Sequence, residues 1–460
     1  MMSKSDAYNL KYHITPTHGL LNDPNGLAYF QGQYHVFYQW NPYGTEHKNK
    51  SWGHVVSDDL VNWHRKETAL VPSEWYDKDG IYSGGSIVHE GKLYLFYTGN
   101  VINKDGTRAS YQCAAVSEDG HQFQKLGPLF EHPAGYTRHV RDPKVWKDDS
   151  GNWWLIVGAQ REDLTGDALV YKSEDLISWS CQGSFLEQEH SFGYMWECPD
   201  VLQFPEHDVF VFSPQGLPEE GDQYKNPNQS GYIVGRISES GKFLGTLSDF
   251  NELDRGFDFY APQTFKVNNR ILMFGWMSAM TEETEQAVPT IEEGWVHALT
   301  LPREIVFADG VLYQRPLHEL QLLRQHEVHE GISNSGQWSL PSLAAEVVIR
   351  FMEQPDSFRL IIRNTVQIDY DHEQNSLTVW RTNWLTNEKE HRKAVLGHSL
   401  AELHMFIESS SIELFVNEGE EVFSLRYFLE DTNERSVRFE SDCSEAVLSM
   451  YRLQESIDEE

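Results

Sequence analysis

The stretch Gly-Gln-Tyr-His-Val-Phe-Tyr-Gln at residues 32–39 is the first of five apolar, β-rich runs that recur along the chain about every sixty residues. The others are GKLYLFYTG at 91–99, GNWWLIVGA at 151–159, HDVFVFSPQG at 207–216 and NRILMFGWM at 269–277. A repeat of this length, built from short strands between Gly, Asn, Asp or Pro turns, is typical of a propeller blade. The sequence therefore predicts a five-bladed β-propeller over residues 1–315.

A second series of motifs supports the same period. SDDLVNW begins at residue 57, SEDGHQF at 117, SEDLISW at 173 and SESGKF at 238. A β-helix or another solenoid is the main alternative, but the repeats of those folds are shorter. Two independent markers with one spacing favour the propeller.

The last third of the chain has a different pattern. After about residue 335, short alternating runs such as EVVIRF, SFRLIIRN and SLTVWRT are separated by turns. This pattern is typical of an antiparallel β-sandwich, which we expect at 335–460. Between the two domains, residues 316–334 are predicted to be a linker with a short helix, because PLHELQLLRQHE at 316–327 is the best helical candidate. The fold class is therefore predicted as all-β.

Charge and composition exclude several classes of partner. The chain has 70 acidic and 37 basic residues, a formal charge of −33, which argues against binding nucleic acid or an anionic membrane surface. The N-terminal residues MMSKSDAYNLKYHITP contain no apolar run of signal-peptide length. The 4 Cys have neither disulfide nor zinc spacing. We expect a soluble, cytoplasmic protein with a small-molecule partner; the sequence indicates no oligomeric state.

Polar side chains recur just upstream of each apolar run. Asp23, Tyr82, Asp142 and Tyr260 lie nine residues before the start of their runs, and Glu197 lies ten residues before its run. Equivalent positions in a closed ring of blades lie on a circle around one axis, so these side chains are expected to surround one end of the central channel. The alternative is that acids before a proline only stabilise turns.

Opposed carboxylates in a polar funnel suit glycoside hydrolysis. That reaction needs one acid to protonate the leaving oxygen and a second carboxylate to attack carbon or activate water. A buried trio of acids could instead bind calcium, but the acidic turns at 77–80 and 148–151 do not match a calcium loop. We therefore expect hydrolysis without a metal or an organic cofactor.

Three acidic motifs resemble those of family 32 of the glycoside hydrolases, the invertase and fructanase family. They are NDPNG at 22–26, RDP at 141–143 and ECP at 197–199. The stretches FYQWNPYG at 37–44, SWGH at 51–54 and LPRE at 301–304 are similar as well. The resemblance covers the whole chain and implies a five-bladed propeller followed by a β-sandwich.

The resemblance implies a role for each acid. Asp23 would attack the anomeric carbon of fructose and form a fructosyl-enzyme ester, and Glu197 would act as acid and then as base. Asp142 would stay ionised and steady the transition state. The residues implied to bind substrate are Asn22, Gln39, Trp52, Tyr82, Ser83, Arg141, Tyr260 and Trp276. One block departs from the family pattern: Trp-Ser-Gly-Ser is common, whereas residues 82–85 read Tyr-Ser-Gly-Gly.

The substrate expected from the resemblance is sucrose 6-phosphate, sucrose, or both. A phosphate on the glucose would need basic contacts at the funnel rim, for which His47, Lys48 and Lys50 are the candidates, with Arg138 and His139 as second choice. Within the same class, the alternatives are a hydrolase of short fructo-oligosaccharides and a fructosyltransferase. From another class, the alternative is a non-catalytic sugar-binding propeller.

Overall fold

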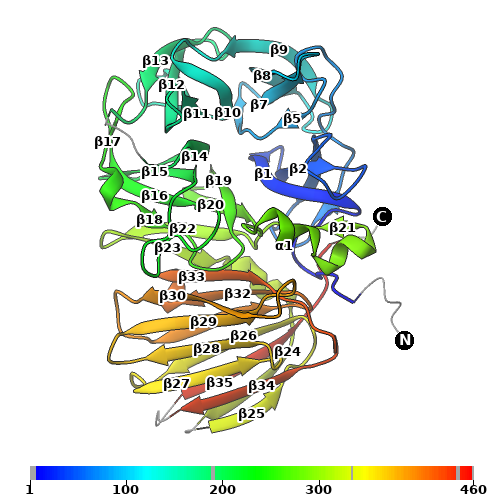
Figure 1. Cartoon of the computed structure of the whole chain (residues 1–460), viewed down its shortest axis with the longest axis vertical. Coiled ribbons are helices and arrows are strands. Elements are labelled where there is room, and N and C mark those ends of the chain that lie inside the picture. The colour runs from blue at the N-terminus through cyan, green and yellow to red at the C-terminus, as the bar shows by residue number, and fades with distance from the viewer. Residues whose placement is uncertain (1–6, 188–191, 333–334, 442–445, 458–460) are drawn as a thin grey trace.

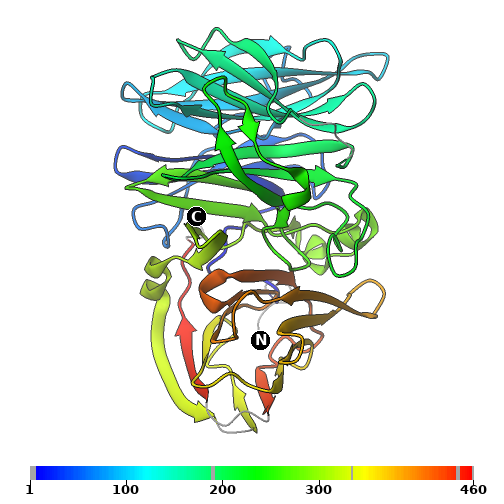
Figure 2. The same cartoon turned by 90° about the vertical axis from the view of Figure 1, so that its left-hand side faces the viewer.

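The computed structural model describes residues 7–187, 192–332, 335–441 and 446–457. The all-β fold class is confirmed: a propeller occupies the upper part of Figure 1 and a β-sandwich the lower part. The view turned by 90° in Figure 2 shows the two domains stacked end to end. Within the described residues, no helix combines the length and the apolar content that crossing a bilayer requires.

The propeller contains five antiparallel sheets among the described residues. The first has β1 (Gly19–Phe30), β2 (Gln33–Asn41), β3 (Ser51–Ser57), β4 (His64–Arg65) and the added β21 (Trp295–Val296). The second has β5 (Ile81–Tyr82), β6 (Ser86–His89), β7 (Lys92–Ile102), β8 (Arg108–Ser117) and β9 (Gln124–Glu131). The third has β10 (Tyr136–Lys147), β11 (Trp153–Arg161), β12 (Gly166–Ser173) and β13 (Ser180–Ser184).

The fourth and fifth sheets complete the ring. The fourth has β14 (Met195–Gln203), β15 (Asp208–Gln215), β16 (Gly231–Ile237), β17 (Phe243–Leu244) and β18 (Asn251–Glu252), and the fifth has β19 (Tyr260–Val267), β20 (Arg270–Trp276), β22 (Arg303–Ala308) and β23 (Val311–Pro316). Strand β1 contacts both β6 and β19, and β14 contacts both β10 and β19. The ring is also closed by β21, which pairs in parallel with the start of β1.

Apolar side chains fill the spaces between neighbouring sheets. The alternating runs of the repeat supply them, since one face of each strand meets the next sheet. Phe37, Trp52 and Leu95 belong to the cluster between the first two sheets. The cluster that joins the fifth sheet to the first also takes in Phe406 and Phe415 of the sandwich, so ring closure and domain docking share one core.

As far as its residues are described, the C-terminal domain is a sandwich of two six-stranded sheets. One sheet has β24 (Arg324–Ile332), β26 (Ala345–Phe351), β31 (Glu402–Ile407), β32 (Ser411–Val416), β33 (Glu421–Arg426) and β35 (Ala446–Leu453). The other has β25 (Ser335–Ser339), β27 (Ser357–Ile362), β28 (Val366–Asp371), β29 (Ser376–Thr382), β30 (Lys389–Val395) and β34 (Ser436–Ser441). Their inward side chains form one apolar core.

The predicted linker at 316–334 is mostly ordered structure. Its first half holds the 3₁₀ helix η4 (His318–Leu323), and its second half is β24, which pairs with β35 in the sandwich. The sandwich therefore begins before residue 335. At the start of the chain, Tyr8 and His13 hydrogen-bond to the sandwich, at Leu429 and Glu413.

The helices among the described residues are short. Besides η4 they include the 3₁₀ helices η2 (Leu247–Asp249), η3 (Pro289–Glu293) and η5 (Asn417–Gly419). The α-helix α1 (Glu282–Gln286) was not predicted from the sequence. Thr281 is its N-cap, and three acids occupy its first turn, where the helix dipole favours negative charge. This helix matters because it forms part of the wall of the cavity that the three acids line.

Candidate active site

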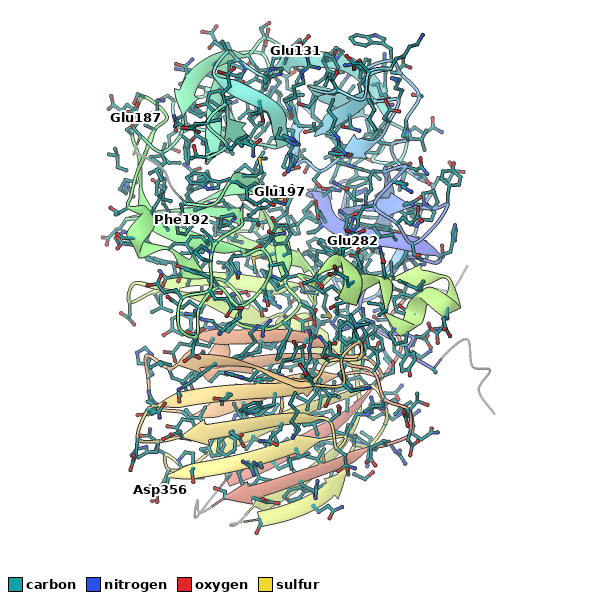
Figure 3. The ribbon with its side chains drawn as sticks, viewed as in Figure 1. Glu131, Glu187, Phe192, Glu197, Glu282 and Asp356 are labelled. Carbon is teal, nitrogen blue, oxygen red and sulfur yellow. The ribbon has the colours of Figure 1, made fainter. Side chains whose placement is uncertain are left out.

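A cavity of about 930 Å³ opens at one end of the propeller channel, and the three predicted acids line it. Figure 3 shows Glu197 near the middle of the propeller, with Glu282 of α1 on the side toward the sandwich. The walls come from the inner strands of the sheets, from the β2–β3 connection and from α1. Segments far apart in the sequence therefore meet around one space.

A local irregularity presents the functional side chains. Arg141, Glu197 and Tyr260 pair with Gly158, Ser213 and Trp276, and in each strand the register shifts immediately afterwards. The residues that follow these three, Asp142, Cys198 and Ala261, have positive φ angles of 66°, 45° and 51°. Such bulges redirect side chains and are a source of backbone strain at functional sites.

This geometry corrects the register that the sequence suggested. The spacing placed Glu197 level with Asp142, whereas the strand pairing makes Glu197 equivalent to Arg141 and Tyr260. Asp142 is equivalent to Cys198, the residue after Glu197. The one-residue offset has a consequence, because Arg141 and Glu197 then occupy the same position on adjacent inner strands and meet.

Glu197 accepts hydrogen bonds on both carboxylate oxygens. Nε of Arg141 donates to Oε1 at 2.7 Å, while Nε2 of Gln215 and the hydroxyl of Tyr260 each donate to Oε2 at 2.7 Å. The carboxylate still keeps 17% of its side chain exposed to the cavity. Three donors from three strands therefore fix its orientation while leaving it open to a substrate.

Asp142 and Asp23 lie on either side of the Cys198 thiol. Oδ2 of Asp142 accepts the backbone N–H of Cys198 at 2.9 Å, and the Cys198 Sγ lies 3.7 Å from that oxygen and 3.9 Å from Oδ2 of Asp23. Asp23 is held by Asn22 Nδ2 at 3.1 Å and by the hydroxyl of Ser83. The structure thus brings the three acids together in one cluster.

Burial and mutual repulsion perturb this cluster. Burial raises the pKa of Asp142 to about 7, and the charge of Glu197 adds to the rise while Arg141 opposes it. Burial also raises the pKa of Asp23, although the hydrogen bond from Ser83 opposes that change. Carboxyl groups that crowd together in a dry site share protons in this way. The cluster therefore holds a proton close to neutral pH.

The remaining predicted contacts divide into two groups. Asn22, Gln39, Tyr82, Arg141, Tyr260 and Trp276 line the cavity. Ser83 and Trp52 are fully buried behind the wall, where Ser83 bonds to Asp23 and Nε1 of Trp52 donates to the carbonyl of Tyr82 at 3.1 Å. The structure does not bring Trp52 to the cavity; it supports the strand that carries Tyr82.

The three basic candidates of the 46–50 loop already have partners. Nε2 of His47 lies 3.0 Å from Oε1 of Glu285, and Lys48 pairs with Glu46 at 2.9 Å on the exposed rim. Lys50 is buried and donates to Asn22, and burial lowers its pKa to about 7. This side of the rim is therefore largely neutralised.

The facing wall carries a basic cluster that the sequence only partly indicated. Arg108, His139 and Arg141 line the cavity together. Burial and the positive charges of Arg141 and Arg108 lower the pKa of His139. The three basic groups are therefore close enough to interact electrostatically. Arg138, the other reserve candidate, does not line the cavity and donates to the carbonyl of Arg108 at 2.6 Å.

Several site residues were missed in the sequence. Gln215 is the last residue but one of the fourth apolar run, and the repeat itself could have pointed to it, since Gln39 ends the first run. Glu285 lies in α1, where Thr281 followed by acids is a helix-start signal. His47, Glu285 and His297 are the described residues whose ligand atoms could hold a metal ion together.

Three carboxylates that line one cavity of a propeller are the kind of groups that sugar hydrolysis requires. The chain is a glycoside hydrolase. It belongs to family 32: the model of the glycosyl hydrolases family 32 N-terminal domain matches residues 13–316, and the family 32 C-terminal model matches residues 319–452.

Individual proteins agree with this assignment. The chain is 42% identical over 436 residues to the sucrose-6-phosphate hydrolase of Bacillus subtilis, a match that covers 93% of this chain and 90% of that protein. A GH32 beta-fructofuranosidase from Bombyx mori superposes with a TM-score of 0.88 at 33% identity, covering 99% of this chain and 96% of that one. The sucrose-6-phosphate hydrolase of Lactobacillus gasseri gives a TM-score of 0.89 at 30% identity, with 98% and 94% covered.

Proposed function

We propose that the protein hydrolyses the β-fructofuranosidic bond of sucrose 6-phosphate, and also that of sucrose, with retention of configuration. Asp23 is the nucleophile and forms a fructosyl ester, while Glu197 protonates the leaving glucose oxygen and then activates water. Asp142 binds fructose hydroxyls and stabilises the positive charge that develops on the ring. The names of the relatives support this class of substrate.

The observation that carries the proposal is the convergence of the three acids in one cavity. Asp142 is buried beside the Cys198 thiol, whereas Asp23 and Glu197 are both partly exposed. Asp23 is held by Asn22 and Ser83, and Glu197 by three donors from neighbouring strands. A nucleophile needs a fixed position against the sugar ring, and an acid/base must reach both the leaving group and incoming water. Two fixed and partly exposed carboxylates fit these two roles.

The charges of the trio change during the reaction. Before attack, like-charge repulsion favours retention of one proton within the trio. In the first step a proton passes to the leaving glucose oxygen while Asp23 becomes a neutral ester. The carboxylate that has lost its proton then takes one from the attacking water, and hydrolysis of the ester restores the charge of Asp23. Arg141, Gln215 and Tyr260 keep Glu197 in place through both steps.

The basic wall supports recognition of the phosphate. A phosphate dianion would relieve the repulsion among Arg108, His139 and Arg141, because it adds negative charge where three basic groups meet. On the opposite rim, the exposed pair of Lys48 and Glu46 costs little to break, so Lys48 can turn to the phosphate. We therefore assign phosphate binding to Arg108 and His139 with help from Lys48, and not to His47 or Lys50.

Initial rates on sucrose 6-phosphate, sucrose and inulin, measured side by side, test the proposal. We expect the highest kcat/KM for sucrose 6-phosphate, a lower value for sucrose, and little activity on inulin. The fructose first released should have the β configuration when the reaction is followed by NMR. Preference for inulin would contradict the substrate assignment, and release of α-fructose would contradict the mechanism.

A further inference from the structure

Three metal-ligand side chains converge at the rim of the cavity. His47 comes from the β2–β3 connection, Glu285 from α1, and His297 directly follows β21. One ligand atom of each lies within 4.8 Å of those of the other two. Nε2 of His47 and Nε2 of His297 approach the same oxygen, Oε1 of Glu285, at 3.0 and 2.7 Å.

We propose that His47, Glu285 and His297 form a binding site at the cavity rim for a divalent transition-metal ion of the Zn²⁺ type. Two imidazole nitrogens and one carboxylate oxygen are a donor set typical of Zn²⁺ with an open fourth position. Mg²⁺ and Ca²⁺ prefer oxygen ligands and are excluded by the two histidines. The site is separate from the carboxylate trio and takes no part in bond cleavage.

The distances fit an ion after a small adjustment. In a tetrahedral site with bonds of about 2.0–2.2 Å, ligand atoms lie roughly 3.3 Å apart. The two nitrogen–oxygen distances must therefore open by a few tenths of an ångström. The His297 side chain is fully buried and acts as the fixed ligand, so the Glu285 carboxylate must move away from it. His47, with 44% of its side chain exposed, can follow that movement.

An ion bound to Nε2 leaves the proton of each imidazole ring on Nδ1. Nδ1 of His297 has no hydrogen-bond partner among the described residues, so coordination breaks no bond of that nitrogen. Nδ1 of His47 lies 3.2 Å from Nζ of Lys50, so the exposed His47 ring must turn away from Lys50 when it binds an ion. Without an ion, the same distances describe two imidazoles donating to one carboxylate oxygen.

The position of the site predicts its effect on the enzyme. His47 and Glu285 line the same cavity as the acids, so an ion that they hold directs its open position into that cavity. The ion also ties the β2–β3 connection to α1 and β21. Bound Zn²⁺ is thus expected to occupy space used by the leaving-group sugar and to raise KM without reducing kcat.

Calorimetric titration of the full chain with Zn²⁺, and separately with Mg²⁺, tests the site without reference to activity. One Zn²⁺ should bind per chain and Mg²⁺ should not. Cu²⁺ should bind more tightly than Zn²⁺, as expected for nitrogen ligands. His47→Ala and Glu285→Gln should each weaken Zn²⁺ binding at least tenfold. Both residues lie at the cavity rim, and the circular dichroism spectra and melting temperatures of the two variants show whether they are folded.

His139→Ala is the matched control, because His139 lies in the same cavity on the other wall. Its affinity for Zn²⁺ should stay within twofold of the original. Absence of Zn²⁺ binding, or equal affinity in folded His47→Ala, would overturn the site and leave the hydrogen-bonded arrangement as the full explanation. The binding experiment does not depend on the proposed substrate, so its failure is distinguishable from failure of the proposed function.

A kinetic measurement tests whether the open coordination position of the ion faces the cavity. Zn²⁺ should raise KM for sucrose, a chelator should reverse the change, and His47→Ala should lose the sensitivity. Binding with unchanged KM would overturn the assignment of the open position to the cavity.

Discussion

Arg141 and Glu197, 56 residues apart in the sequence, form an ion pair between adjacent inner strands of the propeller. Both Nε and Nη2 of Arg141 lie 2.7 Å from Oε1 of Glu197. Burial alone would lower the pKa of Arg141, but the charges of Glu197 and Asp142 raise this pKa. The guanidinium therefore stays charged throughout the reaction. One cation thus connects the proposed acid/base with the proposed transition-state stabiliser.

Replacing Arg141 should move the pH dependence of the reaction. The cation lowers the pKa of Asp142, which lies at about 7 with Arg141 present. We expect kcat/KM to fall below pH 7 as Asp142 takes up a proton, and Arg141→Met should shift this limb upward by roughly 1–3 pH units. Arg141→Lys keeps the charge and should shift it less. If the acidic limb of the pH profile stayed in place in Arg141→Met, protonation of Asp142 would not be its cause.

Glu197→Gln should lose about 10²–10⁴-fold in kcat on sucrose, because general acid catalysis supplies a factor of that size. An aryl fructoside with a good leaving group needs little protonation, so the variant should form its ester on that substrate almost normally. Asp23→Asn is the control and should be inactive on both substrates. Equal losses for Glu197→Gln on the two substrates would contradict its role as acid.

Asp142→Asn should stabilise the protein while impairing catalysis. The folded-state pKa of Asp142 is raised to about 7 from an ordinary value of 3.8, so stability from this group is full below 3.8 and is lost as pH rises through 7. An Asn keeps the acceptor for the Cys198 N–H and carries no charge. The melting temperature of Asp142→Asn should exceed that of the original at pH 8 and match it near pH 4. A lower melting temperature at pH 8 would contradict the argument.

Arg108→Ala should raise KM for sucrose 6-phosphate by about tenfold to a hundredfold, since a charged hydrogen bond contributes roughly 1.5–3 kcal/mol. Sucrose should be almost unaffected. Lys48→Ala should have a smaller effect on the phosphorylated sugar, because Glu46 already competes for its charge. If Arg108→Ala affected both sugars equally, the basic wall would not be the phosphate site.

His13 should make domain docking sensitive to alkaline pH. Its fully buried ring bonds to Glu413 at 2.9 Å and also to Glu408, and these two acids raise the pKa of His13 to about 9 even though burial alone would lower it. The stability it provides is complete below pH 6.5 and is lost as pH rises through 9, by about 3 kcal/mol. Urea unfolding should show this slope, and His13→Gln should abolish it. A slope retained in His13→Gln would assign it to another group.

The sequence by itself determined the architecture and the chemistry. Five apolar runs with a constant spacing predict a propeller because alternation and turn residues act locally, within each blade. The motifs around Asp23, Asp142 and Glu197 carry the acids, and the structure places all three in one cavity. Short-range patterns were sufficient for these conclusions, because each depends on residues close together in the chain.

Only the tertiary structure decided which residues of the site contact one another. The strand pairing puts Glu197 in line with Arg141, one residue away from the alignment with Asp142 that the motifs suggested, and a one-residue offset changes the face of a strand. Trp52 lies behind the cavity wall, and Glu285, in a helix of five residues, takes His47 as a partner across 238 positions. Which charges are already paired depends on contacts between distant segments, and those contacts exist only after the ring of blades has closed.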